Sequence, residues 1–163
     1  MIQILTTGGT IDKVYFDANS TFHIGESLLP ELLREANVQD GYDIRELMRK
    51  DSLELTDQDR ETILGAAKAS QCKRILITHG TDTMAQTAQV LKPLADRTIV
   101  LTGAMQPARM RRTDAVFNIG FAWAAAQLLP PGVYIAMHGE VFEAGAVRKN
   151  LQAQKFERMP GTD

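Results

Sequence analysis

The apolar residues of this chain fall into short continuous runs, separated by longer segments in which they recur at helical spacing. The runs are rich in Ile, Val and Leu and, with one alternating segment, predict strands. The predicted strands cover residues 2–7, 42–48, 74–78, 97–103 and 132–138. The helical spacing between them predicts helices over residues 25–36, 56–69, 81–94 and 113–128, the second one capped by its first residue, Thr56.

Short apolar strands that alternate with helices indicate a parallel sheet covered on both faces. We therefore predict an α/β fold: a three-layer, doubly wound, mainly parallel sheet of the flavodoxin-like or Rossmann-like kind. No repeat or Gly/Ser-rich linker interrupts the pattern, so a single domain is expected over residues 1–163. Residues 10–23 are expected to form an exposed loop, and residues 154–163 a tail or the stub of a linker.

Size and charge narrow the classes of function. The 163 residues carry 18 Lys and Arg against 20 Asp and Glu, a net charge of −2, which does not favour a nucleic-acid partner. The single cysteine, Cys72, excludes an internal disulfide. The chain opens without the features of a signal peptide, and no apolar run is long enough to span a bilayer. A cytoplasmic protein without membrane attachment is therefore expected.

Polar residues follow three of the predicted strands at the point where each strand ends. The segments are "TTGGTI" after the first strand, "THGTDTM" after the third and "TGAMQP" after the fourth. In a doubly wound sheet the carboxyl ends of parallel strands share one edge, and ligands bind in the crevice beyond it. We therefore expect a small-molecule site at this edge.

Thr10, directly after Gly8 and Gly9, has two interpretations. The commoner use of such a hydroxyl is to satisfy backbone donors in a loop. The alternative is a nucleophile on a tight bend, with bare backbone N–H groups beside it to hold an oxyanion. A phosphate-binding turn is disfavoured, because "TTGGTI" has neither the G-x-G-x-x-G spacing nor the lysine of a P-loop.

Thr81 and Asp82 open a predicted helix, so the simple interpretation is a helix cap with an acidic first turn. As a pair at the crevice, they also offer a carboxylate that binds an ammonium group or orients a lysine. Lys149, beside Arg148, is either a solvated cation or, if it lies next to Asp82, a base with a lowered pKa.

No metal site is predicted, because His23, His79 and His138 share no short spacing. The arginines of "RMRRTD", residues 109–114, are expected to face solvent or a subunit contact rather than to bind an anion. No cofactor is indicated.

Together, "ILTTGGTI", "ITHGTDTM", "LTGAMQP" and "DAVFNI" resemble the bacterial-type L-asparaginases, the asparaginase/glutaminase amidohydrolases. The motifs occur in the family's order, and the resemblance extends from Ile2 to about Lys149. It implies hydrolysis of L-asparagine to L-aspartate and ammonia through a threonine acyl-enzyme, without a cofactor.

The resemblance also implies roles for individual residues. Thr10 matches the proposed nucleophile, while Thr81, Asp82 and Lys149 match a second triad. Ser52, in "KDSLEL", matches the serine that binds the α-carboxylate of the substrate, and Asp82 would also bind its α-ammonium group. The remaining substrate contacts and oxyanion donors implied by the resemblance come from Gly9, Ala104 and the Thr81 N–H.

The sequence departs from the family pattern at three points. Family members carry a second, C-terminal α/β domain that helps to close the neighbouring subunit's site, and this chain ends before it. Phe22 stands where the tyrosine of the mobile loop often falls, so Tyr15 is the residue expected to assist Thr10. Leu53 follows Ser52 where many members have a polar residue.

These residues are compatible with four functions. A short L-asparaginase is favoured, because Thr10, Thr81 and Lys149 occur together. A non-catalytic binder of asparagine or aspartate, or a fragment of a longer amidohydrolase, would keep Ser52 and Asp82. The acidic pI disfavours the amidase part of a tRNA-dependent amidotransferase, and the poor phosphate loop disfavours a nucleotide-binding domain. Because the absent domain would cover apolar surface, we expect a homo-oligomer, a dimer or tetramer.

Overall fold

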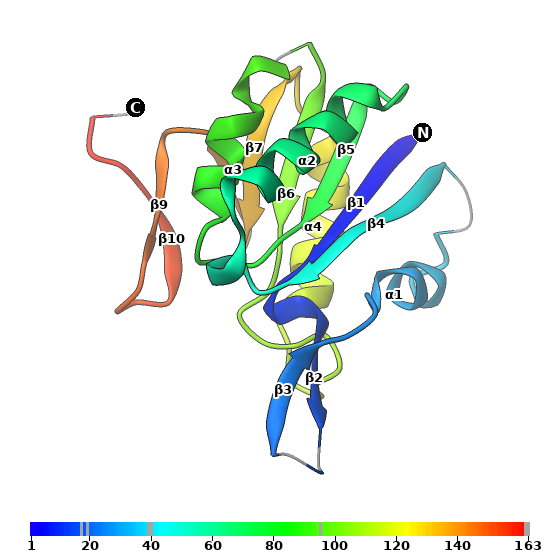
Figure 1. Cartoon of the computed structure of the whole chain (residues 1–163). Coiled ribbons are helices and arrows are strands. Elements are labelled where there is room, and N and C mark those ends of the chain that lie inside the picture. The colour runs from blue at the N-terminus through cyan, green and yellow to red at the C-terminus, as the bar shows by residue number, and fades with distance from the viewer. Residues whose placement is uncertain (17, 19, 39–40, 95, 162–163) are drawn as a thin grey trace.

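The computed structural model of the chain is a central sheet with two helices on each face (Figure 1). It describes residues 1–16, 18, 20–38, 41–94 and 96–161. Its α-helices are α1 (Leu29–Glu35), α2 (Asp57–Ala69), α3 (Met84–Leu91) and α4 (Ala115–Leu128). Short 3-10 turns occur at η1 (Thr10–Asp12), η3 (Ser52–Glu54) and η4 (Lys92–Leu94).

The central sheet has the strand order β4-β1-β5-β6-β7-β8, and its first five strands are parallel. They are β4 (Tyr42–Lys50), β1 (Ile2–Gly8), β5 (Arg74–Thr78), β6 (Thr98–Thr102) and β7 (Gly132–Met137). β8 (Glu140–Glu143) runs antiparallel to β7. The α/β fold with a mainly parallel, doubly wound sheet, predicted from the apolar runs, is confirmed.

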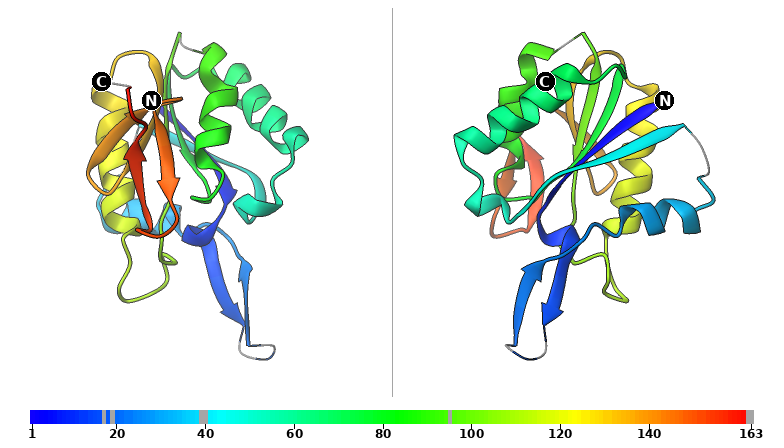
Figure 2. Two further views of the ribbon diagram at one scale, coloured as in Figure 1. Left: turned by 90° about the vertical axis from the view of Figure 1, so that its left-hand side faces the viewer. Right: turned by 45° about the vertical axis from the view of Figure 1, so that its right-hand side comes forward.

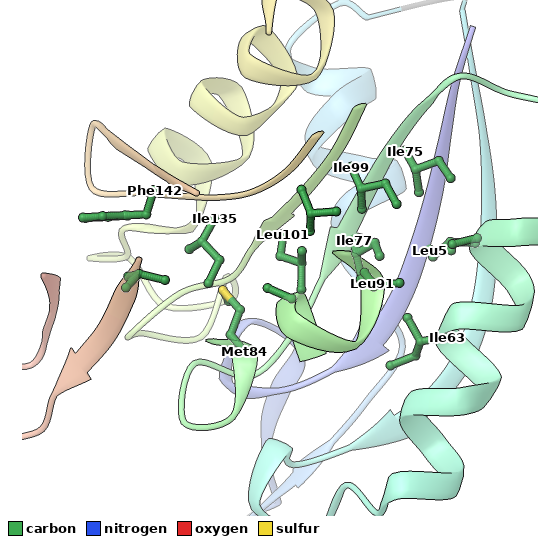
Figure 3. Close-up of a cluster of buried hydrophobic side chains, with 14 of the residues drawn as sticks. Leu5, Ile63, Ile75, Ile77, Met84, Leu91, Ile99, Leu101, Ile135 and Phe142 are labelled. Atoms are coloured by element: carbon green, nitrogen blue, oxygen red, sulfur yellow. The ribbon is translucent and has the colours of Figure 1, made fainter. Parts of the chain in front are cut away.

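Two apolar clusters, one on each face, hold the helices to the sheet. On one face, Ile63 of α2 and Met84 and Leu91 of α3 pack on side chains of the strands (Figure 3). On the other face, Leu33 of α1 and Ile119 of α4 pack on the opposite side chains of the same strands. Figure 2 shows α4 and the pair α2 and α3 on opposite sides of the sheet. Because both faces are covered, the strands are apolar at consecutive positions.

Two hairpins occupy segments for which no regular structure was expected. β2 (Lys13–Phe16) and β3 (Thr21–Ile24) pair antiparallel, where the sequence suggested a loop. β9 (Val147–Asn150) and β10 (Lys155–Arg158) pair antiparallel, where a tail or linker stub was expected from residue 154. The β2–β3 hairpin projects from the carboxyl edge of the sheet, and the β9–β10 hairpin lies beside α3 (Figure 1).

The helix ends also differ from the expected ones. Residues 25–28 precede α1, so its proline, Pro30, stands in the first turn, where a missing N–H costs nothing. Residues 81–83 lie outside α3, which leaves Thr81 and Asp82 in the loop. The predicted cap at Thr56 is confirmed, and Asp59 completes a capping box with it. None of the helices in the described ranges has the length and apolar composition that crossing a membrane requires.

Candidate functional site

The loops after β1, β4 and β5 touch backbone to backbone at the carboxyl edge of the sheet. A Cβ atom added to Gly9 would lie 2.4 Å from the Gly80 Cα atom, and one added to Gly80 would lie 2.6 Å from the Ser52 side chain. Gly8 and Gly9 have φ values of 94° and 89°, a region that favours glycine. The glycines in these motifs therefore allow three loops to meet in one place.

Thr10 is half-buried and begins the turn η1. The Asp12 N–H donates to the Gly9 carbonyl at 3.1 Å and closes this turn. The Ala108 N–H donates to the Ile11 carbonyl at 2.9 Å, which ties the turn to the loop after β6. Thr10 therefore lies in a turn that is held by its own hydrogen bond and by a second one to the loop after β6.

Lys149 joins Thr81 and Asp82 in one hydrogen-bonded group. Its Nζ atom donates to Thr81 Oγ1 at 2.8 Å and to Asp82 Oδ1 at 2.6 Å. The Lys149 side chain is only 9% exposed, whereas that of Asp82 is 33% exposed. The second carboxylate oxygen, Oδ2, faces no cation among the described residues, so Asp82 can hold Lys149 and still accept from a ligand.

The β9–β10 hairpin brings Lys149 to this place. Phe156 of β10 is 4% exposed, and its ring centroid lies 6.4 Å from that of Phe142 on β8. Lys149 pairs with Phe156 in the register of the hairpin. The apolar contact of Phe156 therefore anchors the hairpin whose other strand carries the lysine.

Ser52 is 1% exposed, and its Oγ atom has no hydrogen-bond partner among the described residues. A buried hydroxyl without a partner is costly, so this atom is a ready donor to a ligand. The neighbouring Asp51 accepts from the Leu53 N–H at 3.1 Å and forms an ion pair with Lys13 at 3.1 Å. Burial works to raise the pKa of Asp51, but these hydrogen bonds and nearby cations hold it below its usual value.

His79 is fully buried and orients the peptide that follows it. Its Nδ1 atom lies 2.7 Å from the Gly80 carbonyl, and its Nε2 atom 2.8 Å from the Thr87 hydroxyl. Because a carbonyl only accepts, Nδ1 carries the proton and Nε2 accepts from Thr87. Burial lowers the pKa of His79 to about 4, so the ring is neutral at neutral pH. The sequence interpretation gave His79 no such role.

Some backbone N–H groups at the edge are free to donate. The Gly80 carbonyl and the Thr81 N–H belong to one trans peptide and point in opposite directions, so the N–H turns away from His79. In the described part of the chain, the N–H groups of Thr10 and Thr81 have no hydrogen-bond partner. The Gly9 N–H, expected as an oxyanion donor, instead donates to the Lys50 carbonyl at 2.9 Å.

Tyr15 and Ala104 complete the set of expected residues. Tyr15 lies on β2, 50% exposed, with its ring 5.3 Å from that of Phe22 on β3. No hydrogen bond joins Tyr15 to Thr10 among the described residues, so the hairpin does not bring the two hydroxyls together in this structure. Ala104 is 1% exposed and lies two residues after the end of β6, in the loop at the same edge.

Asp12 is a buried carboxyl group that the sequence interpretation missed. It is 2% exposed and accepts from the Ser27 hydroxyl and the Leu28 N–H. Burial raises its pKa to about 6, although these hydrogen bonds and Arg109 act in the opposite direction. Its position two residues after Thr10, in a run read as an exposed loop, gave no signal of burial.

Within the described ranges, no three His, Cys, Asp or Glu side chains lie together in a way that could hold a metal ion. The edge offers hydroxyl, ammonium, carboxylate and backbone N–H groups. These groups can fix a small zwitterion at both ends and hold charge that develops on a carbonyl oxygen.

Comparison with known proteins shows the protein family to which this chain belongs. Residues 1–159 match the family described as "Asparaginase, N-terminal", so the chain belongs to the asparaginase family. It is 34% identical to a probable periplasmic L-asparaginase of Haemophilus influenzae, over 91% of this chain and 46% of that protein. It is also 33% identical to one of the glutamyl-tRNA(Gln) amidotransferase subunits of Methanococcus vannielii, over 86% of this chain and 34% of that protein.

The fold has the same relatives. The thermostable L-asparaginase from Thermococcus kodakarensis matches with a TM-score of 0.80 and 27% identity, over 97% of this chain and 51% of that one. A probable cytoplasmic L-asparaginase from Campylobacter jejuni matches with a TM-score of 0.74 and 28% identity, over 91% of this chain and 47% of that one. The chain thus spans about half the length of the L-asparaginases it matches.

Proposed function

We propose that this chain is an amidohydrolase that converts L-asparagine to L-aspartate and ammonia through a threonine acyl-enzyme. The observation that carries the proposal is the group formed by Lys149 Nζ, Thr81 Oγ1 and Asp82 Oδ1, with contacts of 2.8 and 2.6 Å. A protein that only binds an amino acid has no need of a nearly buried lysine on a threonine hydroxyl. Membership of the asparaginase family supports the same class of reaction.

Substrate binding would use the two ends of the zwitterion. The unpartnered Ser52 hydroxyl would donate to the α-carboxylate, and Asp82 Oδ2 would accept from the α-ammonium group. Gly9 and Ala104 would pack against the substrate as backbone walls. Fixing both ends would place the side-chain amide near Thr10, and such positioning supplies much of the rate of an intramolecular reaction.

In the first step, the Thr10 oxygen would attack the amide carbon while its proton passes to a neighbouring base. Tyr15 is the proposed helper, and it would have to reach Thr10 by movement of the β2–β3 hairpin. The N–H groups of Thr10 and Thr81 would hold the oxyanion. The C–N bond would then break, a proton would pass to the nitrogen, and ammonia would leave.

In the second step, a water molecule would attack the resulting ester. The Thr81, Lys149 and Asp82 group would take the proton of this water and deliver a proton to the Thr10 oxygen as the bond from Thr10 to the acyl carbon breaks, which gives L-aspartate. The reaction would need no cofactor and no metal. Its only small-molecule partner would be the substrate, without nucleic acid or membrane. We also propose a cytoplasmic location, although the relatives are described as periplasmic in one case and cytoplasmic in another.

The test is ammonia release from L-asparagine, with L-glutamine in parallel, by the wild type and by Thr10→Ala and Thr81→Ala variants. We expect turnover by the wild type and a loss of about 1,000-fold or more in each variant, as for other nucleophiles and their activating groups. Ser52→Ala should mainly raise KM, because it removes a contact made equally in ground and transition states.

A different result would favour the alternative functions. If the wild type shows no turnover but binds L-aspartate saturably by calorimetry, the chain is a binder or part of a longer amidohydrolase. Ser52→Ala should then abolish that binding. If the wild type shows neither turnover of L-asparagine nor binding of L-aspartate, both the enzyme and the binder are contradicted.

A further inference from the structure

Asp114, the residue directly before α4, joins three parts of the fold and takes no part in the steps proposed above. Its Oδ1 atom accepts from the N–H groups of Met105 at 3.1 Å and Gln106 at 3.0 Å, in the loop after β6. Its Oδ2 atom accepts from Asn118 Nδ2 of α4 at 2.9 Å and lies 2.8 Å from Nε2 of His138, in the turn between β7 and β8. This carboxylate therefore ties the loop after β6 to a helix and to a second turn.

Asn118 completes the same network from inside the molecule. It is fully buried, and its Nδ2 atom also donates to the Gly103 carbonyl at 3.0 Å. Its Oδ1 atom accepts at 3.0 Å from the N–H of His138, whose φ of 52° is uncommon for a residue other than glycine. Asp114 and Asn118 thus hold the backbone immediately before and immediately after Ala104.

Asp114 is ionised at neutral pH. Burial works to raise its pKa, but the N–H groups of Met105 and Gln106 and the His138 ring hold the pKa below its usual value. Hydrogen bonds to an ionised acceptor are shorter and stronger than those between neutral groups. The path of the loop after β6 therefore depends on this carboxylate.

The direction of the Met105 N–H fixes that of the Ala104 carbonyl. The two groups belong to one trans peptide and point in opposite directions, so the carbonyl points away from Asp114. In the ranges that the structure describes, no backbone N–H donates to this carbonyl. The loop also lies against the candidate site, because a Cβ atom at Gly103 would clash with the carbonyl of His79. An acceptor without a backbone donor therefore stands at the carboxyl edge of the sheet.

We propose that Asp114 is a positioning residue: through the Met105 peptide, it holds the Ala104 carbonyl toward the substrate of the proposed amidohydrolase. This role rests on the proposed function and deepens it. A carbonyl only accepts, so it would accept from the NH2 group of the side-chain amide of L-asparagine and would repel a carboxylate oxygen at the same place. The amide group would then be held at a fixed angle to the Thr10 oxygen. Asp114 would thus favour the amide over the acid without touching either.

Turnover of L-asparagine and calorimetric binding of L-aspartate, measured on the full 163-residue chain, test this role. Asp114→Ser removes the carboxylate but keeps a residue that suits a helix N-terminus. It should lower kcat/KM for L-asparagine by about tenfold or more, because the amide is less well aligned. The Kd of L-aspartate should stay unchanged, since its side-chain carboxylate cannot donate to Ala104. General damage to the site would weaken both.

Asp114→Asn is the conservative variant. Its amide oxygen can still accept from the N–H groups of Met105 and Gln106, so kcat/KM for L-asparagine should return to within about threefold of the wild type. Asp57→Ala is the matched control: Asp57 lies in the first turn of α2 with a fully exposed side chain, so its removal should change neither measurement. Cooperative thermal unfolding of each variant verifies that it is folded.

The outcomes separate the role of Asp114 from the proposed function. An Asp114→Ser variant that turns over L-asparagine like the wild type overturns this role alone. A loss of turnover and of L-aspartate binding in the same proportion would indicate a merely structural residue and overturn it as well, as would an Asp114→Asn variant impaired by about tenfold or more. A wild type without turnover contradicts the proposed function, and the role of Asp114 falls with it.

Discussion

Gly9 shows how much one residue contributes to the site. Its backbone has φ 89° and ψ −175°, and any side chain there would meet the Gly80 backbone at 2.4 Å. The glycine is therefore required both by conformation and by the contact between two loops. The sequence predicted the bend from the pair of glycines but not the neighbour that makes the second one necessary.

Replacing Gly9 with alanine should separate the β1 and β5 loops. We expect Gly9→Ala to lower the free energy of unfolding by about 2–4 kcal/mol, through strain at positive φ and the clash with Gly80. Ammonia release from L-asparagine should fall at least tenfold. Gly65→Ala, on the outer side of α2 with no atom within 4 Å, is the control and should be neutral or stabilising by up to about 1 kcal/mol. Urea unfolding of both variants measures the difference.

Asp12 makes the stability of the protein depend on pH. Its pKa is about 6 in the folded protein against an ordinary value of 3.8, so the folded state retains the proton over that interval. The stability that this group contributes is therefore present below about pH 3.8 and is lost as pH rises through 6. The charged groups that act on it are Arg109, which favours the ionised form, and Glu46, which opposes it.

Asp12→Asn removes this titration and should stabilise the protein at pH 8. The raised pKa of Asp12 corresponds to at most about 3 kcal/mol of lost stability when the carboxyl ionises. We expect Asp12→Asn to raise the free energy of unfolding by about 1–3 kcal/mol, because asparagine still accepts from the Leu28 N–H. Near pH 4 the advantage should vanish. Urea unfolding of both proteins at several pH values gives the difference, and a gain independent of pH would contradict the assignment.

The elements differ in how well the sequence predicted them. Strands such as β5 and β6 are buried on both faces, so their continuous apolar runs identify them without other information. The β2–β3 hairpin buries little apolar surface, since Tyr15 is 50% exposed and Phe22 is 49% exposed. Its sequence therefore shows no alternation of apolar and polar residues from which a strand could be predicted. β8 was missed because its turn uses His138 and Gly139, both at positive φ, in place of a more common Asn-Gly pair.

The β9–β10 hairpin gives a prediction at the scale of the element. Phe156→Ala removes the apolar anchor of the hairpin and should lower the free energy of unfolding by about 3 kcal/mol, at the low end of the range for a buried Phe→Ala substitution. Because Lys149 depends on this anchor, we expect kcat for L-asparagine to fall by at least tenfold, with a smaller change in KM. Leu151→Ala, in the exposed turn of the same hairpin, should leave both values unchanged. Unchanged kcat in Phe156→Ala would show that Lys149 is held by its own contacts alone.

For the whole molecule, topology predicted that three polar loops would share one edge of the sheet but not how their side chains are arranged. The doubly wound sheet placed the "TTGGTI", "THGTDTM" and "TGAMQP" loops at one edge, as the sequence suggested. From the residues alone, the place of Lys149 beside Thr81 and Asp82 was one of two open interpretations, and the resemblance favoured it, because no local pattern relates residues on separate elements. The direction of the Thr81 N–H depends on the buried His79, and such a peptide orientation leaves no trace in composition or spacing.

The contact between Lys149 and Thr81 joins residues 68 positions apart and uses one of the last strands of the chain. On the ribosome, β1, β5 and β6 and most of the core are synthesised before the lysine emerges. Non-local contacts of this kind also form slowly, because the chain entropy lost in closing them is paid first. Nascent chains would therefore acquire a packed core before they acquire the complete hydrogen-bonded group. A truncation that removes β9 and β10 would remove Lys149 and with it the hydrogen-bonded group.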